Sequence, residues 1–145
     1  MIALLQRVTE ASVQIEAQRT AEIANGLLVF IGVERDDTAS RVDRLLERVL
    51  GYRIFADAQG RMNLSVSDIS GGLLLVPQFT LVADTSTGTR PGFSTAAEPA
   101  TGRRWFEFMV EAARRRHHQV ASGSFGADMQ IFLVNDGPVT FWLQS

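Results

Sequence analysis

Two largely apolar runs constrain the fold of this chain more than any other feature. The first, GLLVFIGV, covers residues 26–33, and the second, GGLLLVPQFTL, covers residues 71–81. Apolar runs of this length, bounded by glycine, predict buried strands. The chain is therefore expected to fold around a central β-sheet. Its 145 residues, 46% of them hydrophobic, suit one domain spanning residues 1–145.

Two amphipathic segments predict helices that cover this sheet. The first follows the possible N-cap residues Asp36, Asp37 and Thr38, and the second begins near Pro99. Apolar residues recur at helical spacing in both segments. In the first they are Val42, Leu45, Leu46, Val49 and Leu50, and in the second Trp105, Phe108, Met109 and Ala112.

The remaining patterns predict further strands and one long loop. Strands are expected at residues 2–8, 12–17, 53–55, 73–82, 128–134 and 139–143, and the polar loop at residues 83–98. Strands outnumber helices, and the helices are separated along the chain. The predicted fold class is therefore α+β, with a mostly antiparallel, curved or barrel-like sheet and two main helices.

Composition excludes several kinds of chemistry. The chain has no cysteine, so it has neither a disulfide framework nor a thiolate nucleophile. All 14 basic residues are arginine, which excludes a Walker A lysine and a Schiff-base lysine. No metal site and no cofactor are expected. No apolar run approaches the ~20 residues of a membrane span, and a cytoplasmic location is expected.

Gln78 and Thr80 are polar residues in an otherwise apolar segment. If residues 73–82 form one strand, both side chains lie on the same face. One interpretation is a hydrogen-bonded pair that caps the end of a strand. In the other, Pro77 interrupts the ladder and exposes backbone N–H groups, which are able to bind an oxyanion. Thr80 is also a candidate nucleophile, although a neutral threonine needs a base.

Three other positions invite a functional reading. Gly137-Pro138 follows Asn135-Asp136, a combination typical of a turn. Arg7 shares strand parity with apolar residues, so it is either a snorkelling edge arginine or a residue with a role on that face. The segment RRRHH, residues 114–118, is typical of a solvated helix C-terminus, and the alternative is contact with an RNA backbone.

Several segments together resemble the D-aminoacyl-tRNA deacylases, also described as D-tyrosyl-tRNA(Tyr) deacylases. These segments are PQFTL at 77–81, RPGFS at 90–94 and NDGPVTFWLQ at 135–144, with MIALLQRVTEASV at the start and LLERVLGYRIFAD at 45–57. The resemblance covers essentially the whole chain. It implies a homodimeric hydrolase that cleaves the ester between a D-amino acid, or mischarged glycine, and the 3′-terminal adenosine of tRNA.

The resemblance also implies roles for individual residues. Gly137 and Pro138 match the family's Gly-cisPro dipeptide, which reaches into the partner subunit's pocket and excludes L side chains. Arg7 matches the arginine that orients the dipeptide. The segment Gln78, Phe79 and Thr80 matches the residues that line the scissile ester. Phe125 and Met129 lie where the family packs the adenine.

One residue departs from the family pattern. Pro77 stands where the family has serine, so a hydroxyl and a backbone N–H are absent. This departure keeps open a non-catalytic nucleic-acid-binding module of the same fold, as in relatives described as binders of DNA-unwinding elements. A small-molecule esterase is a second alternative. If tRNA is the partner, Arg90, Arg103 and Arg104 are candidates to contact its phosphates.

Overall fold

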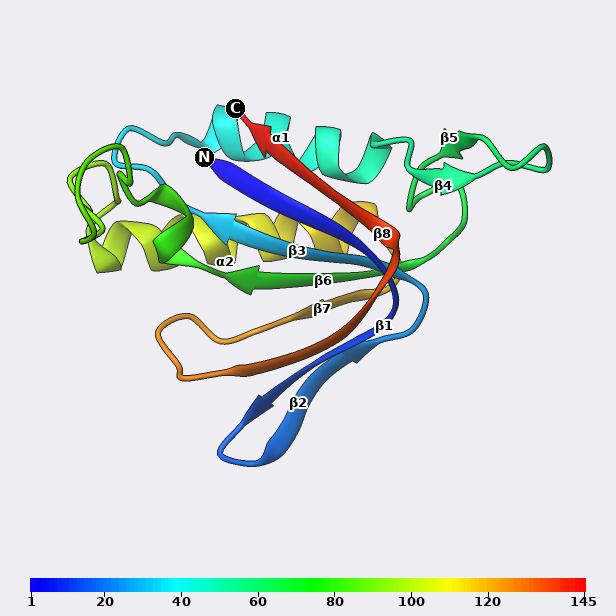
Figure 1. The fold of residues 1–145 in the computed structure, drawn as a ribbon, viewed down its shortest axis with the longest axis horizontal. Helices are drawn as coiled ribbons and strands as arrows, with labels where there is room; N and C mark the ends of the chain where they lie inside the picture. The colour runs from blue at the N-terminus through cyan, green and yellow to red at the C-terminus, as the bar shows by residue number, and fades with distance from the viewer.

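The computed structural model describes all 145 residues, and it contains two long helices and a curved sheet (Figure 1). The helices are α1 (Ala39–Gly51) and α2 (Pro99–Arg116), and a short 3₁₀ helix covers Phe79–Val82. The strands of the main sheet are β1 (Ile2–Ile15), β2 (Gln18–Ile23), β3 (Gly26–Gly32), β6 (Gly72–Pro77), β7 (Val120–Ser122) and β8 (Gln130–Gln144). A separate hairpin is formed by β4 (Phe55–Ala56) and β5 (Met62–Leu64).

The sheet is mixed and strongly curved. Its strand order is β2-β1-β3-β6-β7, and β8 pairs with β1. All pairs of β1 are antiparallel, whereas β3–β6 and β6–β7 are parallel. The first half of β1 pairs with β3 and its second half with β2, so the sheet curls around this strand. The α+β prediction is confirmed, with two parallel pairs in the sheet.

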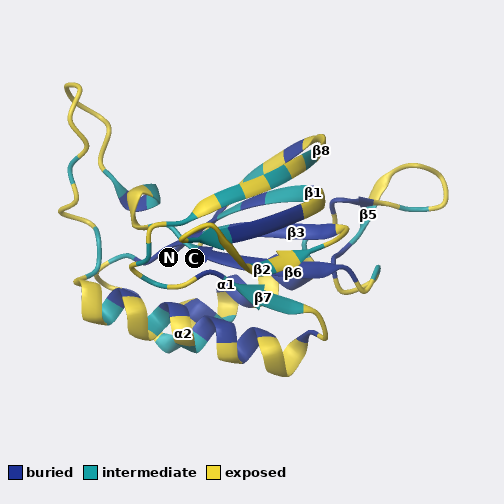
Figure 2. Ribbon diagram, turned by 90° about the horizontal axis from the view of Figure 1, so that it is seen from below, coloured by how far each residue is buried: buried dark blue, intermediate teal, exposed yellow.

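Both helices cover the same face of the sheet (Figures 1 and 2). The five predicted apolar residues of α1 are all buried, which confirms that stripe. In α2, Met109 and Ala112 are buried, but Trp105 and Phe108 are only half-buried. Phe106, Val110 and Ala113 complete the buried face instead. Neither helix is long and apolar enough to cross a membrane.

Several predicted strand boundaries were wrong. Residues 2–8 and 12–15 belong to the single strand β1, because bulges let it bend without breaking, and residues 16 and 17 form the turn to β2. Residues 128–134 and 139–143 likewise fall mostly within one strand, β8. The predicted strand at 73–82 ends at Pro77 and is followed by the 3₁₀ helix, since proline has no N–H to continue the ladder. The strands β2, β5 and β7 were not predicted.

A buried ion cluster ties β1 to the segment before α1. The α-amino group of Met1 donates to Glu34 Oε2 and, at 2.6 Å, to Asp37 Oδ1. The second Asp37 oxygen accepts the backbone N–H of Glu34 at 2.7 Å. Gln144 Nε2, from β8, donates to Glu34 Oε1 at 3.0 Å. These contacts join both ends of the chain to one corner of the sheet.

The cluster predicts a specific pH dependence of stability. Burial alone would raise the pKa of Glu34, but the hydrogen bonds from the Met1 amine and Gln144 outweigh it and hold this pKa below its ordinary value. A depressed native pKa stabilises the fold above the unfolded pKa, and that stability is lost as pH falls through the native value. We expect Glu34→Gln to lack this contribution. Thermal unfolding between pH 3 and pH 6 measures this contribution as the difference in Tm between wild type and variant. The Tm difference should narrow on acidification, and a difference that stays constant would contradict the prediction.

Candidate active site

The segment after β6 forms one wall of a pocket. The backbone N–H of Gln78 still donates to Ile31 O of β3 at 2.8 Å, after which the chain turns into the 3₁₀ helix. Gln78 Nε2 donates to Thr80 Oγ1, so these two side chains form the hydrogen-bonded pair considered from the sequence. The pair lies just beyond the end of β6, so the two side chains do not share one face of a strand as the sequence had suggested. The first N–H groups of a 3₁₀ helix, here those of Phe79 and Thr80, have no acceptor within the helix.

The pocket has a volume of about 460 Å³ and a mostly apolar lining. It brings together the end of β6, the start of α2 and the loop between β7 and β8. Its lining residues are Val76, Pro77, Gln78, Phe79, Ala96, Ala97, Pro99, Phe125, Gly126, Ala127, Asp128, Met129 and Ile131. Four of the predicted site residues, Gln78, Phe79, Phe125 and Met129, therefore line one cavity, and Thr80 contacts Gln78 beside it.

Phe125 is held in the pocket wall from behind by α2. Its ring lies 6.3 Å from the ring of Phe106, and the Arg103 guanidinium stands 5.2 Å from its centroid. Arg103 Nη2 also donates to Phe125 O at 3.1 Å. A Cβ added to Gly102 would stand 3.1 Å from the Phe125 ring. The glycine, unfavourable inside a helix, therefore lets the ring pack directly on α2.

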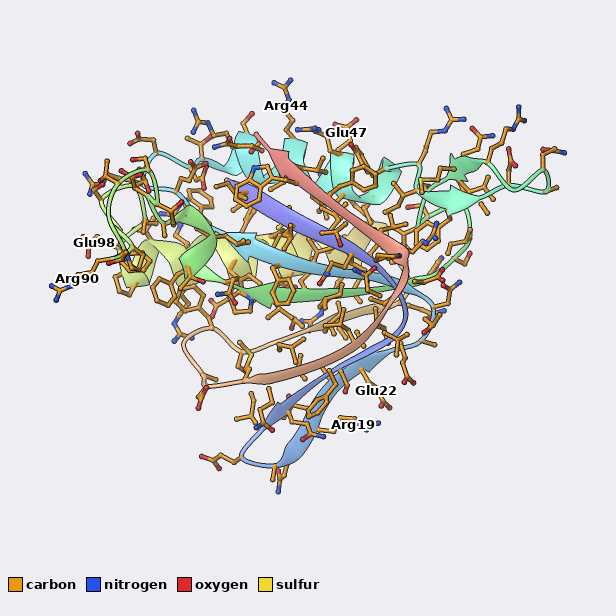
Figure 3. All side chains as sticks on the ribbon, in the orientation of Figure 1. Arg19, Glu22, Arg44, Glu47, Arg90 and Glu98 are labelled. Atoms are coloured by element: carbon orange, nitrogen blue, oxygen red, sulfur yellow. The ribbon has the colours of Figure 1, made fainter.

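The long loop at residues 83–98 borders the other side of the pocket. Phe93 in this loop packs against Phe79, with ring centroids 5.2 Å apart, and Phe79 is 63% exposed. Asp84 pairs with Gly92 across the loop. Two backbone hydrogen bonds between Asp84 and Gly92 close this turn, and hydrogen bonds from Ser86 lower the pKa of the Asp84 carboxyl. Arg90 lies at the exposed end of the loop (Figure 3).

Gly137, Pro138 and Arg7 lie together at the bend of β8 and do not line this pocket. The Gly137–Pro138 peptide bond is cis. Arg7 Nε donates to Asp136 O at 3.1 Å and lies 3.2 Å from Asp136 Oδ2, while Nη1 donates to Ile54 O at 2.7 Å. The arginine side chain is only 14% exposed, so it is a buried clamp rather than a snorkelling edge residue. Within one chain, the two groups of predicted residues form separate sites.

The structure only partly agrees with the solvated helix C-terminus predicted for residues 114–118. His118 is exposed, as are the three arginines before it, but His117 is buried. His117 Nε2 lies 2.6 Å from Gly71 O, and since a carbonyl oxygen only accepts, this nitrogen carries the proton. His117 therefore joins the end of α2 to the sheet. No group of three or more His, Asp or Glu side chains is arranged to hold a metal ion.

Some lining residues were not predicted from the sequence. Ala96, Ala97 and Pro99 reach the pocket because α2 begins at its mouth, and Asp128 contributes a charge to its lining. The lining residues between Phe125 and Met129 gave only a weak indication of a loop, because the SFGADM segment is polar and contains glycine. The contact between this segment and β6 depends on the parallel pairing of β6 with β7.

A family model and individual relatives both match this chain over nearly its whole length. The family model described as D-Tyr-tRNA(Tyr) deacylase matches residues 4–144. A D-aminoacyl-tRNA deacylase of Methylococcus capsulatus is 58% identical over 144 residues, covering 99% of this chain and 94% of that protein. One of Burkholderia vietnamiensis is 58% identical over 149 residues, covering 99% and 98%. The solved structure of a c-Myc DNA unwinding element binding protein superposes with a TM-score of 0.96 at 33% identity, covering 100% and 99%.

Proposed function

The chain belongs to the D-Tyr-tRNA(Tyr) deacylase family, and from this premise we propose that it hydrolyses the ester between a D-amino acid and the 3′-terminal adenosine of tRNA. Glycine mischarged on tRNA is a second substrate. The observation that carries the proposal is the pocket of about 460 Å³, whose mostly apolar lining includes Gln78, with Thr80 hydrogen-bonded to Gln78 beside the cavity. This tRNA chemistry belongs in the cytoplasm.

Two pairs of residues at the pocket suit the two parts of this substrate. Phe125 and Met129 offer flat and polarisable apolar surfaces, which suit a purine base. Gln78 lines the same pocket, and Thr80 is hydrogen-bonded to it next to the first N–H groups of the 3₁₀ helix. In this arrangement the adenine binds against the first pair, and the ester lies near the second.

The proposed mechanism needs no metal and no protein nucleophile. An aminoacyl ester is an activated bond, and the neighbouring ribose hydroxyl is held close to it at high effective concentration. The N–H groups of Phe79 and Thr80 are suited to stabilise the oxyanion that forms when water attacks the carbonyl. Gln78 and Thr80 position the ester, so the absence of a histidine beside them is no obstacle.

Selection against L-aminoacyl-tRNA is proposed to come from a second subunit. In a homodimer, Gly137 and Pro138 of one protomer would enter the pocket of its partner and exclude an L side chain by contact with backbone. The exposure of Gly137 and Pro138, the Arg7 clamp behind them and their separation from the pocket of their own chain support this arrangement. So do Phe132, Val134 and Trp142, apolar side chains of β8 that are each about half exposed.

Steric selection of this kind predicts the substrate range. A backbone that blocks the L side chain acts whatever the identity of that side chain, so D residues of many kinds are accepted. Glycine has no side chain to exclude, and it therefore enters the pocket too.

The nucleophile role of Thr80 is tested by removing its hydroxyl. We expect Thr80→Ala to keep kcat within roughly tenfold of wild type, because loss of one positioning hydrogen bond costs about 0.5–1.5 kcal/mol. Single-turnover hydrolysis of D-tyrosyl-tRNA measures this, with Thr85→Ala in the exposed loop as the control. Complete loss of turnover with normal tRNA binding would show that Thr80 is the nucleophile.

The position of Phe125 is tested at Gly102. Alanine would favour the helix by up to ~1 kcal/mol, but its Cβ would press on the Phe125 ring. We expect Gly102→Ala to raise KM for D-tyrosyl-tRNA roughly fivefold with little change in kcat, since an overpacked wall costs on the order of 1 kcal/mol. Thr101→Ala is the matched helix control. An unchanged KM in a more stable protein would mean that Gly102 does not fix the ring.

The activity itself is tested by adding purified protein to D-tyrosyl-tRNA with a chelator present. Release of D-tyrosine is expected. The rival function is the one named for the structural relative, binding of a DNA unwinding element. It predicts no hydrolysis and strongly salt-dependent binding that ignores the aminoacyl group. Turnover of simple esters without tRNA would indicate the small-molecule esterase instead.

A further inference from the structure

The charges of this protein are segregated by layer. The two helices hold eight arginines and four acidic residues, which gives them a net charge of +4. The rest of the chain holds six arginines and twelve acidic residues, or −6, and the two values account for the overall −2. All eight helical arginines are exposed. A protein that is acidic overall therefore presents a basic helical layer.

Most of this positive charge belongs to α2. This helix carries five arginines and two glutamates, a net charge of +3. Arg103 and Arg114 pair with glutamates of the same helix, and Arg116 pairs with Asp43 of α1. Arg104 and Arg115 form no ion pair, and Arg104 stacks on Trp105 at 4.6 Å. The two unpaired arginines are eleven residues, or three turns, apart, which places them on one face about 16 Å from each other.

The helix begins at the mouth of the pocket. Pro99 at its first turn lines the cavity, and Arg103 contacts Phe125 in the cavity wall. From there α2 runs back along the molecule to Arg115 and Arg116 (Figure 1). A nucleic acid whose end occupies the pocket therefore meets a row of exposed guanidinium groups if it leaves along α2.

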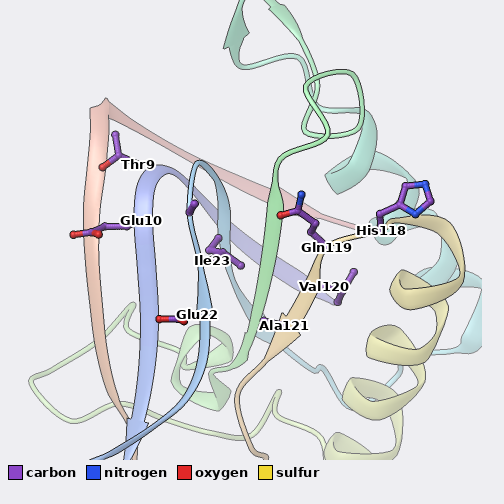
Figure 4. Close-up of a pocket in the computed structure, with 9 residues that line it drawn as sticks. Thr9, Glu10, Glu22, Ile23, His118, Gln119, Val120 and Ala121 are labelled. Atoms are coloured by element: carbon purple, nitrogen blue, oxygen red, sulfur yellow. The ribbon is translucent and has the colours of Figure 1, made fainter.

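A groove between strands of the sheet would repel the same ligand. This groove, between β1, β2 and β7, is lined by Glu10 and Glu22, which lie on neighbouring strands (Figure 4). Glu22 and Arg19 lie on β2, away from the helices (Figure 3). Arg19 and Glu22 form a 2.8 Å ion pair, whereas the carboxylate of Glu10 has no ion-pair partner. Phosphates would be attracted along α2 and disfavoured across this groove.

We propose that the outer face of α2, with Arg104 and Arg115 as its free cations, binds the acceptor stem of the tRNA whose 3′ end occupies the pocket. The inference rests on the proposed function and adds the surface and direction of the bound stem. Arginine suits this role because its guanidinium pairs with phosphate through two hydrogen bonds. The contacts are with phosphates, so they add affinity for many tRNAs without selecting among base sequences.

The test compares two double variants of equal charge. Arg104→Ala with Arg115→Ala removes the free cations of α2, and Arg19→Ala with Arg61→Ala removes two exposed arginines elsewhere. Each lowers the net charge from −2 to −4, because two arginines are lost. Hydrolysis is measured on D-tyrosyl-tRNA at several salt concentrations and on D-tyrosyl-adenosine, which has the ester but no stem.

The α2 variant is expected to lose about tenfold in kcat/KM on D-tyrosyl-tRNA at low salt, through KM, and its slope of log(kcat/KM) against log[salt] should be shallower by about 1–2. The α2 variant should still hydrolyse D-tyrosyl-adenosine at close to the wild-type rate. The control double variant should hydrolyse both D-tyrosyl-tRNA and D-tyrosyl-adenosine at close to the wild-type rate. Equal effects of the two double variants on tRNA would overturn the inference while leaving the deacylase function intact. Loss of D-tyrosyl-adenosine hydrolysis in the α2 variant would also overturn it, since the pocket itself would then be disturbed. If wild type hydrolysed neither ester, the proposed function would fail, and the inference with it.

Discussion

Replacing Arg7 with alanine is expected to reduce turnover of D-aminoacyl-tRNA by about 100-fold, the cost of misplacing a positioning group by roughly 1 Å. Arg7 binds the carbonyl and carboxylate of Asp136 and the carbonyl of Ile54, so it fixes the segment that leads into Gly137. A Cβ at Gly137 would stand 3.1 Å from Arg7 Nη2, so the two residues are in close contact. Without the guanidinium, these contacts to the segment before Gly137 and Pro138 are lost, and the proposed placement of the dipeptide in a partner's pocket would become imprecise.

Two further variants separate this role from general stability. Arg7→Lys keeps the charge but loses the forked geometry, so little activity should return. Arg48→Ala is the matched control, because Arg48 also donates to a β8 carbonyl, Gln144 O at 2.7 Å, but far from the Gly137 bend. It should retain full activity. An Arg7→Ala protein that folds, dimerises and keeps both its turnover and its preference for D substrates would contradict the clamp.

Replacing Asp37 with alanine is expected to cost roughly 3–5 kcal/mol of folding stability, the range for breaking one side of a buried ion pair. The Asp37 side chain is fully buried, as is Met1, and their charged groups lie 2.6 Å apart. The substitution also leaves the Glu34 N–H without its acceptor. For a domain of this size 1 kcal/mol corresponds to about 2–4 °C, so Tm should fall on the order of 10 °C.

The neighbouring Asp36 provides the control for this loss. It is exposed and forms no ion pair, so Asp36→Ala should change stability by at most about 0.5 kcal/mol. Denaturant unfolding of both variants, with equal m-values, would assign the difference to the buried pair. An Asp37→Ala protein within about 1 kcal/mol of wild type would show that the Met1 amine finds sufficient compensation from Glu34 alone.

Features that depend on local periodicity were predictable from the sequence. The stripe from Val42 to Leu50 was correct because the period of an α-helix fixes which residues share a face. Thr38 was among the predicted N-caps, and it accepts the Arg41 N–H. Pro77 correctly indicated a possible end of the strand, and β6 does end there. This effect is local, because proline itself lacks the backbone N–H that the ladder would need.

Features that depend on long-range pairing were not predictable. The strand β2, QRTAEI, is mostly exposed and offers no apolar pattern, so only its pairing with β1 makes it a strand. Residues 130–144 contain a turn-like NDGP, yet pairing with β1 continues on both sides of the bend. The pocket joins residues 76–79 to residues 125–131 through the parallel β6–β7 pair. The family resemblance, rather than any local pattern, connected Phe125 and Met129 to Gln78.

Hydrolysis of matched D-tyrosyl- and L-tyrosyl-tRNA by the purified protein, with a chelator present, is the most direct test of the proposed deacylase function. We expect rapid loss of the D ester and survival of the L ester, which would also show that Pro77 is compatible with activity in place of the family serine. Hydrolysis of both esters at similar rates would contradict chiral selection by Gly137 and Pro138. Survival of both esters with a folded dimer would contradict the deacylase function and favour nucleic-acid binding without catalysis.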